Sequence, residues 1–238
     1  MQKKFMLSAF LSLCLSLVAV ADQVFFDNFD DGNYDGWTAK QGNWSVASGC
    51  LSSTYNYGVI WVDGSYGVNQ SLQVDSYFDL TGGQADKIAH LRLRTSDNGS
   101  PQTYWDTGYM AEVRCDGSNS SVSIRNTFLG GNPVIASYTF SSSDNPFDNT
   151  GWYTLNYSVT GTGSDTHFQL SVNGVTYIDE LYANTYSELD SGYIGLGREI
   201  CYDNFQSTTD IAAVPLPSAI LLSIIGLSSC GLLKKRIA

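Results

Sequence analysis

The sequence predicts an all-β domain in the central part of this 238-residue chain, with antiparallel strands forming a sandwich or a barrel. Apolar and polar residues alternate over short runs, which is typical of strands with one buried face. Gly, Asn, Asp and Ser separate these runs, and no segment keeps a helical period over a window of about 11 residues. Many short strands with one apolar face require a second sheet to cover that face.

The predicted strands follow one another through the centre of the chain. The alternating runs are Ser71–Leu80, Ile88–Arg94, Met110–Cys115, Val134–Phe140, Trp152–Val159 and Phe168–Val172. Asn173 and Gly174 come directly after the last run and precede Val175–Ile178. Because both residues tolerate positive φ, they predict a tight hairpin turn between two strands.

The first 21 residues have the organisation of a signal peptide. Lys3 and Lys4 precede an apolar core, and the small residues Ala19 and Ala21 mark a cleavage position. We therefore expect export by the Sec route and a mature chain that starts at Asp22.

Residues 214–238 have the organisation of a membrane anchor. Two prolines, in the order Val214, Pro215, Leu216, Pro217, precede 16 uncharged residues and then Lys234, Lys235 and Arg236. The prolines favour an extended joint. The apolar run is slightly shorter than the about 20 residues that span a bilayer, and its basic end predicts a cytoplasmic terminus.

The order of these motifs resembles the carboxy-terminal sorting signals of bacterial PEP-CTERM proteins, in their VPLP-type variant. The resemblance implies a transmembrane helix, a transient stay in the inner membrane of a Gram-negative bacterium, and cleavage by an exosortase-type processing enzyme. The mature form would then lie in the cell envelope, on the cell surface or in the extracellular matrix.

The segment between the two signals, residues 22–213, is one domain in size and strongly acidic. It holds all 23 acidic residues but only 7 of the 12 basic ones, so its formal charge is −16. Nucleic acid is not an expected partner, because phosphate binding requires clustered Lys and Arg. The charge favours solubility, and it also permits divalent cations to bind.

Several segments of this domain resemble concanavalin A-like, laminin G-like jelly-roll domains. They are Phe25–Thr38, Gly42–Val46 and Gly49–Ser52 near its start, and Trp152–Val159, Leu170–Val175, Gly192–Gly197 and Tyr202–Phe205 near its end. The resemblance implies an antiparallel two-sheet jelly-roll sandwich whose first and last strands lie side by side. It would also bring the Asp27 loop close to Asp203.

We do not expect an enzyme. Jelly-roll glycosidases carry a Glu-x-Asp-x-x-Glu strand, but Glu188-Leu189-Asp190 is followed by Tyr193 at the closing position. Glu112-Val113-Arg114 is similar to a strand of alginate lyases, whose Gln-x-His partner motif is absent here. His90 and His167 are expected at surface or half-buried strand positions.

Calcium is the predicted ion. Asp27, Asp30 and Asp31 lie in one turn, and the resemblance adds Asp203, so hard oxygen ligands could surround a structural calcium ion. The alternative is that these side chains cap turns through their own backbone.

Two groups of aromatic residues are candidates for glycan binding. Tyr104 and Trp105 lie in a polar loop, and the odd spacing of Tyr55, Tyr57 and Trp61 places them on one face of an extended segment. Flat exposed aromatic rings stack on sugars, although packing in the core is the alternative for each group. The remaining tryptophans, which we expect to be buried, are Trp37, Trp44 and Trp152.

The cysteines fit an oxidising compartment. Cys50, Cys115 and Cys201 lie in the domain, so one disulfide and one unpaired cysteine are expected, in any of three pairings.

Together these patterns predict an exported glycan-binding or adhesive protein whose partner is a cell-surface or extracellular polysaccharide. Two alternatives stay open: a polysaccharide hydrolase or lyase of jelly-roll fold, and a structural protein of a biofilm matrix.

Overall fold

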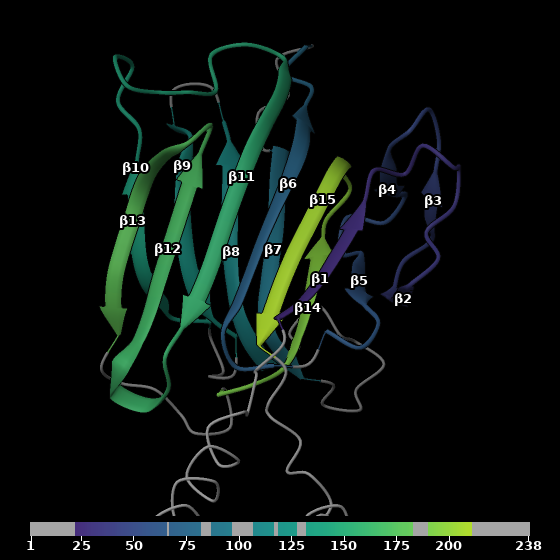
Figure 1. Cartoon of the computed structure of the whole chain (residues 1–238). Helices are drawn as coiled ribbons and strands as arrows, with labels where there is room; N and C mark the ends of the chain where they lie inside the picture. The colour runs from purple at the N-terminus through teal and green to yellow at the C-terminus, as the bar shows by residue number, and fades with distance from the viewer. Residues whose placement is uncertain are drawn as a thin grey trace, which may run out of the picture. The chain divides into compact units, whose positions relative to one another are not determined.

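The domain is a sandwich of two antiparallel sheets. The computed structural model describes residues 22–65, 67–81, 87–96, 107–116, 119–127, 132–182 and 190–210. Asp22–Asp210 form one compact unit. The two sheets lie one behind the other in Figure 1, and we name them sheet A and sheet B.

Sheet A occupies the front layer of Figure 1. Its strands, in spatial order, are β13 (Val175–Tyr182), β12 (Thr166–Val172), β11 (Gly151–Thr160), β6 (Gln70–Phe78), β15 (Cys201–Asp210), β4 (Leu51–Ser53) and β3 (Trp44–Val46), and β1 (Asp22–Asp27) pairs with β15. A short 3₁₀ helix, η3 (Gly163–Asp165), connects β11 to β12.

Sheet B lies behind it. Its strands, in spatial order, are β10 (Val134–Thr139), β9 (Ser121–Asn126), β8 (Thr107–Cys115), β7 (Lys87–Ser96), β14 (Tyr193–Gly197), β5 (Val59–Val62) and β2 (Trp37–Gln41).

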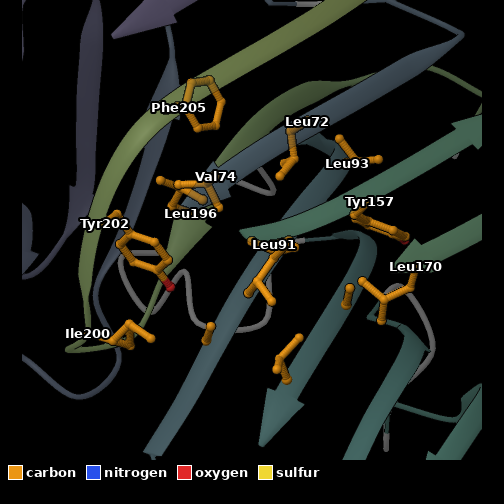
Figure 2. Close-up of a cluster of buried hydrophobic side chains, with 14 of the residues drawn as sticks. Leu72, Val74, Leu91, Leu93, Tyr157, Leu170, Leu196, Ile200, Tyr202 and Phe205 are labelled. Atoms are coloured by element: carbon orange, nitrogen blue, oxygen red, sulfur yellow. The ribbon is translucent and has the colours of Figure 1, made fainter. Parts of the chain in front are cut away.

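The core lies between the sheets because every second side chain of each strand points inward. Leu72 and Val74 of β6 belong to this core together with Leu91 and Leu93 of β7 (Figure 2). The residues between them in the sequence point away from the core. Each sheet therefore has an outer face made of the alternate residues of its strands.

The sandwich and its strand pairing confirm the predicted fold. β1 and β15 are antiparallel neighbours, with Asp22 opposite Asp210. Asn173 and Gly174 join β12 to β13 with φ values of 49° and 79°, which fits the predicted hairpin turn. Each predicted run corresponds to a strand, whereas β1–β5, β9, β14 and β15 were not among the predicted runs.

One of the three possible cysteine pairings is formed. Cys50, just before β4, is bonded to Cys201 at the start of β15. Cys115 is a free thiol in the core, and burial raises the pKa of that thiol. Trp37 and Trp44 are buried, as predicted.

The terminal segments lie outside the described residues. This applies to the signal peptide with Ala19 and Ala21, and to the sorting signal with its VPLP motif and basic end. Among the residues that the structure describes, no helix is long and apolar enough to cross a membrane.

Candidate functional site

Two of the acids predicted to bind calcium cap turns instead of pointing together. Asp27 accepts hydrogen bonds from the backbone N–H of Phe29 and from Nε1 of Trp37, both at 2.8 Å. Asp31 accepts hydrogen bonds from the backbone N–H of Asn33 at 3.1 Å and from its side-chain amide at 2.8 Å. Asp27 and Asp31 therefore make hydrogen bonds typical of turn-capping residues, which was the alternative to calcium binding.

Asp203 nevertheless lies in a group of carboxylates. Burial raises the pKa of Asp203, and the negative charges of Asp30, Asp75 and Asp27 raise it further. Asp75 on β6 was not among the predicted ligands, and Asp31 is not among the charges that act on Asp203. Within the described ranges, no three His, Cys, Asp or Glu side chains are arranged to hold a metal ion.

The predicted aromatic groups are only partly exposed. Tyr55 and Tyr57 are 43% and 41% exposed in the turn between β4 and β5, with their rings edge to face at 5.8 Å. Tyr104 and Trp105 lie outside the described residues.

Trp61 does not belong to an exposed platform, so this part of the prediction is wrong. It is 3% exposed, on β5, and its ring stacks on Tyr193 with centroids 5.0 Å apart. Lys40 Nζ lies 4.5 Å from the centroid of the same ring. A Cβ atom on Gly195, the residue opposite, would meet Trp61 Cδ1 at 2.7 Å, so the indole fills the space that this glycine leaves.

Trp152 was predicted to be buried, but it is 48% exposed, so this prediction is also wrong. In β11 the alternate residues Tyr153, Leu155 and Tyr157 enter the core, so Trp152 points to the outer face of sheet A. Its ring lies 5.3 Å from that of Tyr77, its partner on β6. The pair forms an aromatic surface on neighbouring strands.

Hydrogen-bonding groups follow this pair along the same strands. Asp75 Oδ1 accepts a hydrogen bond from Thr154 Oγ1 at 2.6 Å, and Asp75 Oδ2 accepts one from Asn204 Nδ2 at 3.0 Å. These residues come from β6, β11 and β15, which are adjacent in sheet A (Figure 1). The carboxylate is thereby held in place beside the aromatic pair.

A shallow groove of about 280 Å³ lies further along the same face. Asn156 and Gln73 begin it, and they are the next outward residues after Thr154 and Asp75. Its lining is uncharged and almost entirely made of hydroxyl and amide side chains, namely Ser71, Gln73, Asn156, Ser158, Gln169, Ser171, Thr176, Gln206, Ser207 and Thr208, with Leu72 and Tyr157. We call the Trp152–Tyr77 pair, the Asp75 network and this groove the sheet A face.

No protein-family model and no curated protein matches the chain. Several solved structures have a similar fold. Carbohydrate-binding module CBM66 from Bacillus subtilis has a TM-score of 0.50 and 20% identity, over 75% of this chain and 94% of the module. The exoplasmic domain of VIP36, in a form bound to Ca²⁺ and Man3GlcNAc, has a TM-score of 0.54 and 12% identity, over 81% and 90% of the two chains.

The fold is a lectin-type jelly roll. The concanavalin A-like fold expected from the sequence is thus confirmed. A jelly-roll enzyme is also similar: an endo-1,3-β-glucanase from Streptomyces sioyaensis has a TM-score of 0.53 and 13% identity, over 79% of this chain and 96% of the enzyme. At such identities the similarity shows the jelly roll and not the ligand, which has to be argued from the residues.

Proposed function

We propose that the protein is an exported envelope or extracellular-matrix protein whose jelly-roll domain binds a polysaccharide on the sheet A face without cleaving it. The observation that carries this proposal is the exposed Trp152, paired with the half-buried Tyr77, at one end of a groove of hydroxyl and amide groups. An exposed tryptophan on a strand face lies where a sugar ring can stack on it.

The chemistry of the face fits a neutral sugar chain. Aromatic rings cover the apolar face of a sugar, while fixed hydrogen-bonding groups bind its hydroxyls. Here Asp75 is fixed by Thr154 and Asn204, and the groove beyond it offers both donors and acceptors. The similar domains of CBM66 and VIP36, one named as a carbohydrate-binding module and the other bound to Man3GlcNAc, support the proposal.

The test is binding of the full chain, purified in detergent, to a panel of neutral polysaccharides. Trp152→Ala should weaken binding by about 1 to 3 kcal/mol, as expected for an aromatic anchor. Its melting temperature should stay close to that of the wild type, because the ring is half exposed. The double change Tyr55→Ala with Tyr57→Ala tests the second exposed pair under the same conditions.

Trp37→Ala is the control for a core tryptophan. Trp37 is 6% exposed and packs edge to face on Phe205 at 4.7 Å, so its loss should destabilise the domain by about 3 to 5 kcal/mol. If Trp152→Ala binds every polysaccharide as the wild type does, the sheet A face is not the site. If the wild type binds none of the polysaccharides, the alternative of a structural matrix protein replaces the proposal of a glycan-binding protein.

A second candidate function, polysaccharide hydrolysis, is favoured by one observation. Asp75 and Asp203 lie opposite each other on β6 and β15, and burial together with neighbouring carboxylates raises the pKa of Asp203. Glycosidases use two carboxylates, one of them protonated. Release of reducing ends in the binding assay, abolished by Asp203→Asn, would select the enzyme over the lectin.

We also propose that the protein is exported through its signal peptide and processed at its carboxy terminus by an exosortase-type enzyme. The VPLP motif, the apolar run and the basic end support this proposal. Mass spectrometry of the protein from the cell envelope should find a terminus near residues 214–218. An intact Ala238 in a host that contains an exosortase would contradict processing.

Calcium is the proposed structural ion, bound at Asp203 and at the carboxylates that act on it, Asp30, Asp75 and Asp27. Within the described ranges these side chains are not arranged as a metal site, so binding would turn them away from the hydrogen bonds that they now make. The mutual effect of these carboxylates supports this assignment, because a bound cation would relieve their repulsion. The ion would join the first and last strands of the domain.

A further inference from the structure

β1 adds two exposed apolar side chains to the outer face of sheet A. Phe25 packs edge to face against Trp37 and Phe205, so it points into the domain. Strand alternation therefore turns Val24 and Phe26 outward, where they are 58% and 60% exposed. The first strand of the domain thus contributes a small apolar surface at the edge of the sheet.

The strand register of sheet A brings Phe26 to the groove. Phe26 lies opposite Gln206 on β15, and Gln206 lies opposite Gln73 on β6. Gln73 in turn lies opposite Asn156 on β11. Residues opposite each other on neighbouring strands have side chains on the same face, about 5 Å apart. Asn156, Gln73 and Gln206, which we call the amide row, therefore cross three strands of the groove and end at Phe26.

The amide row is available to a ligand. Gln73 and Gln206 are exposed, and Asn156 is half-buried. Within the part of the chain that the structure describes, none of these three side chains has a hydrogen-bond partner. The hydroxyls of Ser71 and Thr208, further along the same strands, instead bind each other at 2.6 Å. Because each amide has both donors and an acceptor, the row can bind sugar hydroxyls without giving up bonds of its own.

Trp152 and Phe26 lie at opposite corners of this surface. Three strand pairings lead from β11 through β6 and β15 to β1 (Figure 1), which amounts to about 14 Å across the sheet. Trp152 precedes Asn156 by four residues, or about another 14 Å along β11. The two rings are thus about 20 Å apart, with Tyr77, Asp75 and the amide row between them. A single ligand that contacts both rings has to be a chain of several sugars.

We propose that the sheet A face binds a stretch of several sugars in a linear, neutral polysaccharide, which stacks on Trp152 at one end and on Phe26 at the other. This inference rests on the proposed glycan binding and names the ligand class of that site. The rings cover the apolar faces of two separate sugars, and the amide row binds hydroxyls between them. Since both anchors hold one chain, contact at one raises the effective concentration at the other.

The test measures binding of the full chain in detergent to laminarin, glucomannan and dextran, and to the disaccharide and hexasaccharide of the polymer that binds best. The wild type should bind the hexasaccharide at least about tenfold more tightly than the disaccharide. Phe26→Ala should weaken hexasaccharide binding about tenfold, as expected for an aromatic anchor. It should leave disaccharide binding nearly unchanged, because a disaccharide held at Trp152 does not reach Phe26. Its melting temperature should match the wild type, since the ring is exposed.

Leu181→Ala is the matched control. Leu181 is also 60% exposed, and it lies opposite His167 on the outer face of β13, at the other edge of sheet A. Its loss removes a similar apolar surface outside the region between Trp152 and Phe26, so hexasaccharide binding should stay within about twofold of the wild type. Phe26→Tyr should keep the affinity and Phe26→Leu should not, because stacking on a sugar requires a flat ring.

The proposal is overturned if Phe26→Ala binds the hexasaccharide as the wild type does. If Trp152→Ala still weakens binding in that case, glycan binding on the sheet A face stands and only the contact with Phe26 is wrong. If the wild type binds none of the polysaccharides, both proposals fail. Light scattering of the same samples gives a separate check: a wild-type dimer that dissociates in Phe26→Ala would assign Phe26 to a contact between two copies of the chain, and would overturn the proposal as well.

Discussion

His90 is a neutral side chain in the middle of a charged cluster. Burial lowers the pKa of His90 to about 3, and the charges of Arg92 and Arg198 act in the same direction, against the effect of Glu112. The side chain is fully buried, so the prediction of a surface or half-buried histidine is wrong. The hydrogen bond with His90 and the charges of Arg125 and Arg114 lower the pKa of Glu112 to about 2, although burial opposes them.

These shifts predict that stability falls in acid. Between pH 6.5 and about 3 the unfolded chain holds a proton on His90 that the folded domain lacks, so the free energy of unfolding should fall by about 1.4 kcal/mol per pH unit in this window. Glu112 acts in the same direction at lower pH, because its stabilising charge is lost as pH falls from 4.5 through about 2.

Urea unfolding between pH 7 and 5 measures the contribution of His90. The pH dependence of the free energy of unfolding should be smaller in His90→Gln by the contribution of the proton on His90. The variant His167→Gln measures the contribution of the other histidine separately. Equal slopes in His90→Gln and the wild type would show that His90 is protonated in the folded state.

At the scale of elements, the β12–β13 hairpin depends on two left-handed residues. Gly174 has a φ of 79° and open space around its α-carbon, so Gly174→Ala should destabilise the domain through backbone strain alone, by about 1 to 2 kcal/mol. Gly151→Ala is the matched control, since it too has open space but no positive φ, and it should cost less. Thermal unfolding of both variants checks this, and equal losses would contradict the strain argument.

The elements were predictable where one face of a strand is apolar and the other polar. In β11 both sets of alternate residues include aromatic ones, so the sequence does not reveal that Trp152 is on the outer set. In β5 all four residues are apolar and buried, which leaves no alternation to place Trp61. The sequence therefore predicted β11 as a strand and the segment around Trp61 only as extended, and it did not place either tryptophan on the correct face.

The candidate sites could not be predicted from the sequence, because they depend on the order of the strands in space. Asp75 joins Asp203 because β6 pairs with β15, and these strands are far apart in the sequence. Phe26 and the amide row are likewise widely spaced in the sequence, and they form one row only because β1, β15, β6 and β11 are neighbours in sheet A.

For the whole molecule, the calcium proposal predicts a stability that depends on the ion. Calcium at a hundredfold excess over its dissociation constant should stabilise the fold by about 2.7 kcal/mol. Asp203→Ala should abolish this gain. Asp31→Ala is the control that should keep it, because Asp31 is bound by Asn33 and does not act on Asp203. Equal melting temperatures in calcium and in chelator would mean that these acids only cap turns.

The pairing of β15 determines how the domain carries mechanical load. Over its last residues β15 is hydrogen-bonded to β1 on one edge and to β6 on the other. A force applied at Asp210 acts along the strand, so both ladders are sheared together and their bonds resist at the same time instead of opening one by one. The Cys50–Cys201 bond fixes the far end of the same strand. The arrangement of these strands and of the disulfide therefore opposes pulling at the carboxy-terminal end of the domain.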